Sequence, residues 1–191
     1  AMPIDMFQEL MAWSSQLRTS QKYLSAVTDQ LLALPQGGTA VGTGINAPPR
    51  FSREFAKEVS KIEKIKARPS DNFFHSLSSQ DTSLHLSGEM RNLATVLMKI
   101  SNDLRWMNSG PLSGLGEIEL QALQPGSSMM PGKVNPVIPE AVTMVCAEVI
   151  GNDTTVAIAA QSGNFQLNVM LPVIAYNLLK SLNILSNAMS V

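Results

Sequence analysis

The sequence predicts an all-α protein built as a bundle of long helices, and three observations support this. Apolar residues recur at helical spacing along most of the 191 residues, strand-like alternation is confined to residues 117–120, and glycine and proline gather in three loops. No internal repeat or low-complexity segment divides the chain, so we expect residues 1–191 to form one unit.

The most regular helix is predicted over residues 86–107. Its apolar positions alternate in steps of four and three residues, which keeps one stripe facing a partner helix at a shallow crossing angle. The stripe consists of Leu86, Met90, Leu93, Leu97, Ile100, Leu104 and Met107.

The remaining helices are predicted from the same apolar spacing and from the residues that usually begin and end helices. A shorter, more charged helix is expected over 52–67, with Ser52 capping its start. In a later helix Asn152 lies on the apolar stripe, where its amide needs hydrogen-bond partners. The long helices are expected over 6–34, which stops before Pro35, over 139–160 and over 166–189.

The composition narrows the range of partners. Charged residues make up 15% of the chain, against about a quarter in ordinary globular proteins, so we expect subunit contacts to cover part of its surface. The net charge of −1, without a basic stripe, argues against nucleic acid and anionic membranes. No apolar run of the length that a membrane span needs is evident. The single Cys146 favours a reducing compartment, and we expect a cytoplasmic protein.

Three glycine-rich loops, 35–49, 108–117 and 125–136, are expected between the helices. The third concentrates two hydroxyls, Ser127 and Ser128, one ammonium, Lys133, and one amide, Asn135. Such groups can hold a carboxylate and handle a proton. For an arbitrary sequence, a solvated loop before a helix is the simpler interpretation.

A resemblance to a known family favours a chemical role for the third loop over a solvated loop. The segment Gly-Ser-Ser-Met-Met-Pro-Gly-Lys-Val-Asn-Pro, residues 126–136, resembles the signature of the fumarase/aspartase superfamily. Residues 37–46 (Gly-Gly-Thr-Ala-Val-Gly-Thr-Gly-Ile-Asn) are similar to a second superfamily block. Further similar blocks are 109–111, 114–117, 151–153 and 163–169. The whole of residues 1–191 resembles the central helical domain, so the amino-terminal domain, the first part of the central domain and the carboxy-terminal domain are expected to lie outside this chain.

The resemblance implies a role for each polar residue of the third loop. Ser127 corresponds to the base that removes the carbon-bound proton, and Ser128 to a substrate contact. Lys133 corresponds to the residue that binds a substrate carboxylate and stabilises the added charge of the aci-carboxylate intermediate. Val134 and Asn135 correspond to substrate contacts through backbone and amide.

The resemblance also implies a second catalytic residue, Glu140, at the start of a helix. In the family this carboxylate pairs with a catalytic histidine, which belongs to a block just before Met2 and is therefore not in this chain. We expect the active site to be incomplete and residues 1–191 alone to be inactive. His75 and His85 lie in other contexts and are not expected to be catalytic.

Thr43 and Asn46, in the loop 35–49, are further polar candidates near the site. Their glycine-rich segment follows a helix and lacks the Gly-Lys-Ser/Thr ending of a phosphate-binding P-loop. No metal site and no cofactor are expected, because one cysteine cannot hold an iron–sulfur cluster and the two histidines lack a matching set of acidic ligands.

Two details of the motifs favour a metal-free (class II) fumarase among the members of the superfamily. Gly132 stands where aspartases usually have alanine, and residues 163–165 read Gly-Asn-Phe as in fumarases. The segments 137–140 and 151–155 also resemble aspartases. The resemblance therefore implies reversible hydration of fumarate to L-malate by a homotetramer whose active sites are shared between subunits. The alternatives are an aspartate ammonia-lyase and an inactive helical oligomerisation fragment.

Overall fold

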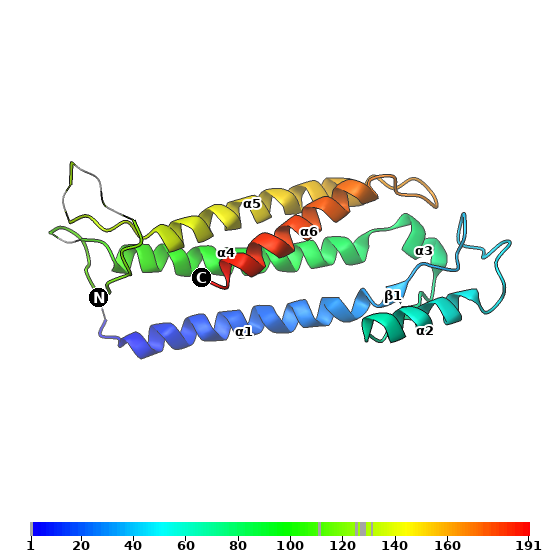
Figure 1. Cartoon of the computed structure of the whole chain (residues 1–191), viewed down its shortest axis with the longest axis horizontal. Helices are drawn as coiled ribbons and strands as arrows, with labels where there is room; N and C mark the ends of the chain where they lie inside the picture. Colours follow the sequence, from blue (N-terminus) through cyan, green and yellow to red (C-terminus); the bar gives the residue numbers. More distant parts are fainter. Residues whose placement is uncertain (1, 111, 125, 127–128, 131) are drawn as a thin grey trace. The chain divides into compact units, whose positions relative to one another are not determined.

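The computed structural model describes residues 2–110, 112–124, 126, 129–130 and 132–191. Helices dominate these residues, as predicted (Figure 1). The long helices are α1 (Met6–Gln30), α4 (Asp81–Met107), α5 (Val137–Ala160) and α6 (Leu171–Ala188), and the shorter ones are α2 (Phe51–Glu63) and α3 (Phe73–Ser78). Two short strands, β1 (Ala33–Leu34) and β2 (Arg68–Pro69), form a parallel pair.

The chain folds into two compact units, each assembled from separate segments. One consists of Ala1–Ser20, Met90–Gly151 and Ser181–Val191, and the other of Gln21–Glu89 and Asn152–Lys180. We call them the first and the second unit. The boundaries fall inside long helices, so no linker or change in composition marks them, and the expectation of one unit did not anticipate this division.

In the first unit, α1 and α4 are joined by a charged cluster around Lys99. The Lys99 ammonium lies 3.2 Å from Glu9 Oε1, is also paired with Asp103, and lies 5.7 Å from the centre of the Trp13 ring. The Trp13 indole N–H donates to the same Glu9 oxygen at 3.0 Å, and Trp13 is buried. Hydrogen bonding to Asp103 raises the pKa of Lys99, which therefore stays charged at neutral pH.

In the second unit, polar groups join the helices at buried positions. The Ser87 hydroxyl of α4 donates to Asp153 Oδ1 of α5 at 2.7 Å. The apolar cluster of Val156, Ala159 and Ile174 joins α5 to α6.

Beside that cluster, the buried Asn168 connects α5 with the start of α6. Its amide donates to the Ala159 and Ala160 carbonyls at 3.0 and 3.2 Å, and its Oδ1 accepts from the Met170 N–H at 2.8 Å. These bonds satisfy groups that the ends of the two helices would leave without partners.

The predicted heptad stripe of α4 is confirmed. Leu86, Met90, Leu93 and Met107 are buried, and the three intervening stripe residues are half-buried. In α1 the helical spacing of Leu10, Leu17, Leu24 and Leu31 predicts an apolar stripe, and this stripe is only partly internal. Its Leu10 and Leu17 are exposed in this chain, whereas Trp13, Ser20 and Val27, at seven-residue spacing, are buried.

Several expected boundaries are wrong, for local reasons. Helix α1 ends at Gln30 instead of residue 34, because Ala33–Leu34 pairs as β1 with β2. Helix α2 ends at Glu63 instead of 67, because Lys64 adopts the left-handed conformation with φ +56°. Ser52 lies inside α2 and does not cap it, since Arg50 occupies the cap position without a side-chain hydrogen bond.

The later boundaries shift as well. Helix α5 begins two residues early, at Val137, and α6 begins at Leu171 because residues 164–167 form a tight antiparallel turn. Residues 117–120 form no strand, since the Glu117 and Ile118 N–H groups donate to the Met107 carbonyl and tie the segment to the end of α4.

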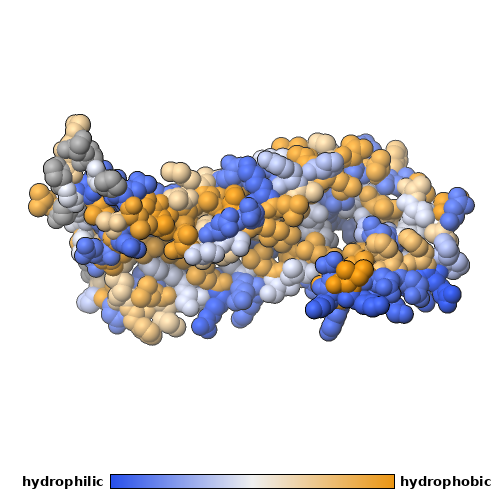
Figure 2. Space-filling model, in the orientation of Figure 1, coloured by the Kyte–Doolittle hydropathy of each residue, from blue (hydrophilic) through white to orange (hydrophobic). Residues whose placement is uncertain are grey.

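Helix α5 corrects the expectation that no segment is apolar and long enough for a membrane span. By length and composition it could cross a membrane, and it is the one such helix in the part of the chain that the structure describes. A third of its apolar stretch is buried, and it carries the buried Asn152 and Asp153. The same composition occurs in core helices of soluble proteins. Apolar side chains cover much of the surface where Figure 1 draws α5 and α6 (Figure 2).

Candidate active site

A cavity of about 490 Å³ in the first unit is lined by four of the residues that the resemblance implied for the site, three from the loop before α5 and one from α5 itself. Lys133, Val134, Asn135 and Glu140 all line it. Ser127 and Ser128, the other two residues of the predicted constellation, lie outside the described residues.

The loop before α5 is folded closely around Lys133. The Lys133 N–H donates to the Met130 carbonyl at 3.2 Å, and Gly132 between them has φ +82°, a conformation that favours glycine. A Cβ atom on Gly126 would lie 2.4 Å from the Lys133 carbonyl oxygen. Gly126 therefore allows a close approach that a side chain would obstruct, and Gly132 allows the positive φ. Together they permit the backbone path that carries Lys133 to the cavity.

Glu140 reaches the cavity from the first turn of α5. Its N–H donates to the Pro136 carbonyl at 3.1 Å, which continues the helix backwards to the loop, and its side chain is half-buried. A carboxylate is favoured at this end of a helix because the first backbone N–H groups carry partial positive charge. An acidic residue therefore suits this position for the helix itself, apart from any role in the site.

The opposite wall comes from the last turns of α4 and the loop that follows. Asn102, Arg105, Trp106 and Ser109 line the cavity, and the Arg105 guanidinium donates to Asn102 Oδ1 at 3.1 Å. Sequence reasoning did not single out Asn102, Arg105 or Trp106. Their spacing of three and four residues would have placed them on one face of the helix together with Ser109, beside the apolar stripe.

Ser109 organises the loop that closes this wall. Its hydroxyl donates to the Trp106 carbonyl at 2.6 Å and accepts from the Leu115 N–H at 3.0 Å. Its carbonyl accepts from the Gly116 N–H at 2.8 Å. Gly114 lies so close to the Ser109 backbone that a Cβ on it would be 2.4 Å from the Ser109 carbonyl oxygen.

Thr43 and Asn46 are not among the residues that line this cavity; they belong to the second unit. Their glycine-rich loop has a packing explanation. A Cβ on Gly37 would lie 2.5 Å from Ser52 Cβ, and one on Gly42 would lie 2.9 Å from the Phe74 backbone nitrogen. The glycines therefore let the loop lie against α2 and α3, and a role for Thr43 and Asn46 in the site stays a prediction.

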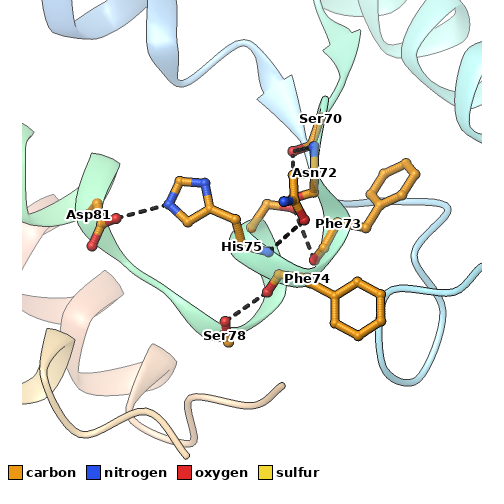
Figure 3. A network of polar contacts seen from close by, with 8 residues as sticks. Ser70, Asn72, Phe73, Phe74, His75, Ser78 and Asp81 are labelled. Atoms are coloured by element: carbon orange, nitrogen blue, oxygen red, sulfur yellow. Dashed lines mark hydrogen bonds and ion pairs between the residues drawn. The ribbon is translucent and has the colours of Figure 1, made fainter. Parts of the chain in front are cut away.

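The chain's histidines have partners within the second unit. His75 Nε2 lies 2.9 Å from Asp81 Oδ2, and the His75 N–H donates to Asn72 Oδ1 at 3.1 Å, which caps α3 (Figure 3). The Ser79 hydroxyl and the His75 ring lower the pKa of the Asp81 carboxyl. His85 lies 3.8 Å from Glu89. These contacts give both histidines a structural explanation.

The described residues offer neither a metal site nor a reactive thiol. In the described part of the chain, no three His, Cys, Asp or Glu side chains gather in a way that could hold a metal ion. Cys146 is buried in α5, and this burial raises the pKa of its thiol, so little thiolate is available at neutral pH.

Comparison with known proteins adds independent information. A family model described as "Lyase" matches residues 1–151. The chain is 59% identical over 187 residues to "Fumarate hydratase class II 2" of Pseudomonas aeruginosa, covering 98% of this chain and 41% of that protein. It is 47% identical over 190 residues to the class II fumarate hydratase of Bacillus subtilis, again covering 41% of the relative.

Solved structures agree in fold. The recombinant class II fumarase from Schistosoma mansoni superimposes with a TM-score of 0.96 at 37% identity, over 98% of this chain and 42% of that one. A Brucella melitensis protein titled "fumarate lyase:delta crystallin", bound to cobalt, gives a TM-score of 0.96 at 46% identity and covers 41% of that chain. The chain thus spans about two fifths of the length of the relatives it matches.

Proposed function

Because this chain belongs to the lyase family whose model matches residues 1–151, we propose that it supplies part of the active site of a class II fumarate hydratase. The reaction is the reversible addition of water to fumarate, giving L-malate. The single observation that carries the proposal is the cavity in which Lys133, Asn135 and Glu140 meet.

The chemistry of these side chains fits the difficulty of the reaction. Removing the proton next to the malate carboxylate leaves an aci-carboxylate with concentrated negative charge. Lys133 provides a compact positive charge, and the Asn135 amide provides two donors that can fix the orientation of a carboxylate. An ammonium that gains attraction as charge develops lowers the barrier, whereas equal attraction to substrate and transition state does not.

Glu140 and Ser127 complete the proposed roles. Glu140, in the first turn of α5, orients the group that handles the oxygen proton. Ser127 takes the carbon-bound proton, a role that rests on the sequence motif. A serine hydroxyl acts as a base only when its negative form is stabilised by nearby donors or cations. Lys133, six residues further along, is a cation of the same loop.

A segment exchange tests the proposal. Residues 1–191 would replace the matching segment of the Pseudomonas aeruginosa relative, which is 59% identical over 187 residues. We expect the hybrid to consume malate, measured by the ultraviolet absorbance of the fumarate formed, and to leave aspartate unchanged. A folded hybrid that releases ammonia from aspartate and does not hydrate fumarate would refute the hydratase proposal and support the ammonia-lyase.

Lys133→Met in the hybrid addresses the role of the cation. Loss of one charge-stabilising group lowers turnover by about 10²-fold or more, with the larger effect on kcat. Lys57→Met is the matched control, because Lys57 is an exposed lysine of α2 in the second unit. Turnover at saturating malate that equals that of the Lys57 variant would remove Lys133 from the mechanism.

We also propose that this chain assembles into a homotetramer whose active sites are shared between subunits. The support is the amount of apolar surface left open on the long helices. Met144 and Ile158 of α5 are 71% and 54% exposed, and Tyr176 and Leu179 of α6 are 62% and 66% exposed. Leaving such surface in water is unfavourable, and covering it with other copies of the chain removes that penalty.

Sedimentation velocity tests the assembly. We expect a species several times heavier than the 20.6 kDa chain at micromolar concentration. Ile158→Lys should shift it towards the monomer, since a charge cannot be buried unpaired at an apolar interface. Ile62→Lys places the same change on the charged helix α2 and should leave the assembly intact. A single 20.6 kDa species from the unmodified chain would refute the proposal.

A further inference from the structure

Two adjacent methionines precede the candidate catalytic lysine, and both are open to solvent. Met129 is 88% exposed and Met130 is 52% exposed, whereas Met90 and Met107 of α4 are 1% and 8% exposed. A methionine thioether that solvent can reach is oxidised by hydroperoxides to the sulfoxide, and burial protects it. The loop therefore presents two oxidisable sulfur atoms within four residues of Lys133.

The backbone holds Met130 beside Lys133. The Lys133 N–H donates to the Met130 carbonyl at 3.2 Å, and a hydrogen bond between residues three apart keeps their Cα atoms within about 7 Å. Gly132, with φ +82°, completes the turn. Both side chains are long and unbranched, so the end of one can reach the end of the other without movement of the backbone.

We propose that Met129 and Met130 form an oxidation site through which a hydroperoxide controls the availability of the Lys133 ammonium. A sulfur lone pair attacks the outer peroxide oxygen, the O–O bond breaks, and an S–O bond forms. The leaving alkoxide or hydroxide takes up a proton to give alcohol or water. Sulfur loses two electrons and the peroxide gains two.

The product changes what faces Lys133. A thioether is a weak hydrogen-bond acceptor, whereas the sulfoxide oxygen is polar and accepts strongly. A sulfoxide on Met130 therefore competes with a substrate carboxylate for the ammonium. Methionine sulfoxide is returned to the thioether by sulfoxide reductases, so the change is reversible. Its consequence for catalysis rests on the proposed function, in which Lys133 binds that carboxylate.

The first part of the test measures where oxidation occurs. The chain is treated with hydrogen peroxide, digested and mapped by mass spectrometry, with Met90 as the protected internal reference. Met129 and Met130 should gain oxygen about tenfold faster than Met90, because a buried thioether reacts only when the structure opens. Equal rates at Met90 and Met130 would overturn the proposal.

The second part measures Lys133 directly. An amine-acylating N-hydroxysuccinimide ester labels lysines, and labelling at Lys133 is compared with labelling at the exposed Lys57. Oxidation should lower the Lys133 label severalfold and leave Lys57 unchanged. The response should disappear in a Met129→Leu, Met130→Leu double variant, which keeps similar side-chain volumes.

Met2→Leu is the matched control, because Met2 is 85% exposed, lies before α1 and outside the α5 and α6 surface that we propose other copies cover, and should be oxidised too. Its variant should keep the full response at Lys133. Unchanged Lys133 labelling when both loop sulfoxides are present would overturn the inference. Neither readout uses catalysis, so failure of the hydratase assay and failure of this inference are distinguishable.

Discussion

Asn168 offers the most direct test of how the second unit is held together. Replacement by alanine removes two hydrogen bonds to the Ala159 and Ala160 carbonyls and one from the Met170 N–H, all at a residue with 0% exposure. The Ala159 carbonyl also accepts from the Ser162 N–H at 3.2 Å, so it keeps one partner. The Met170 N–H and the Ala160 carbonyl lose the bonds described here.

The size of the effect follows from these contacts. Each net hydrogen bond contributes about 1 kcal/mol, and leaving a buried group unpaired adds to the loss, so Asn168→Ala should lower the free energy of unfolding by about 3 kcal/mol. That is a large part of the total stability of a domain of this size, about 5–15 kcal/mol. The control is Asn164→Ala, the same chemical change at an exposed residue whose amide makes one bond, to the Ser162 carbonyl.

The assay is urea unfolding followed by helical circular dichroism, at one fixed protein concentration because assembly also affects stability. We expect a lower midpoint with an unchanged slope for Asn168→Ala, and a change of less than about 0.5 kcal/mol for Asn164→Ala. Equal midpoints for the two variants would refute the idea that Asn168 fastens α5 to α6.

Two further predictions concern local structure. Gly114→Ala should disturb the loop after α4 without unfolding the helices, because the new Cβ would lie 2.4 Å from the Ser109 carbonyl oxygen and Gly114 has φ +154°. The Gly116 amide should then lose protection from hydrogen exchange. Gly110→Ala is the control and should not have this effect, because a Cβ there meets nothing within 4 Å. The lowered pKa of Asp81 means that its ionised form stabilises the fold above the ordinary value of 3.8 and that this contribution is lost as pH falls through the lower folded pKa. The difference in urea midpoint between the native chain and Asp81→Asn should therefore shrink below pH 3.8, and a difference that persists in strong acid would contradict this.

The fold was predictable where it depends on neighbours along one helix. The stripe of α4 was identified from spacing alone, and Leu86, Met90 and Met107 are buried as expected. The ends of helices were less predictable, because they depend on single backbone conformations and on pairing with distant residues. Lys64 ends α2 by adopting a left-handed conformation, and nothing about a lysine in a charged segment indicates that.

The residues of the candidate site likewise fall into some that the sequence predicts and some that it does not. Lys133, Asn135 and Glu140 were identified because residues 126–136 and the helix start that follows resemble the fumarase/aspartase superfamily; their polar groups alone would favour a solvated loop. Asn102 and Arg105 were not, because polar residues on a helix usually face solvent. Only the position of the loop before α5, close to the end of α4, turns that helix face into a cavity wall. Helical spacing could predict that Asn102 and Arg105 share a face, but not what lies opposite.

The charges of the cavity favour an anion, although the net charge of the chain is −1. The charged side chains that line it are Arg105, Lys133 and Glu140, two cations and one carboxylate. The first turn of α5 adds partial positive charge from backbone N–H groups, and Arg105, in the last turn of α4, offsets the partial negative charge of that helix end. Each helix end thus carries the side-chain charge that its own dipole favours. The excess positive charge that results suits the dicarboxylate that the proposed function requires, and composition averaged over 191 residues does not reveal it.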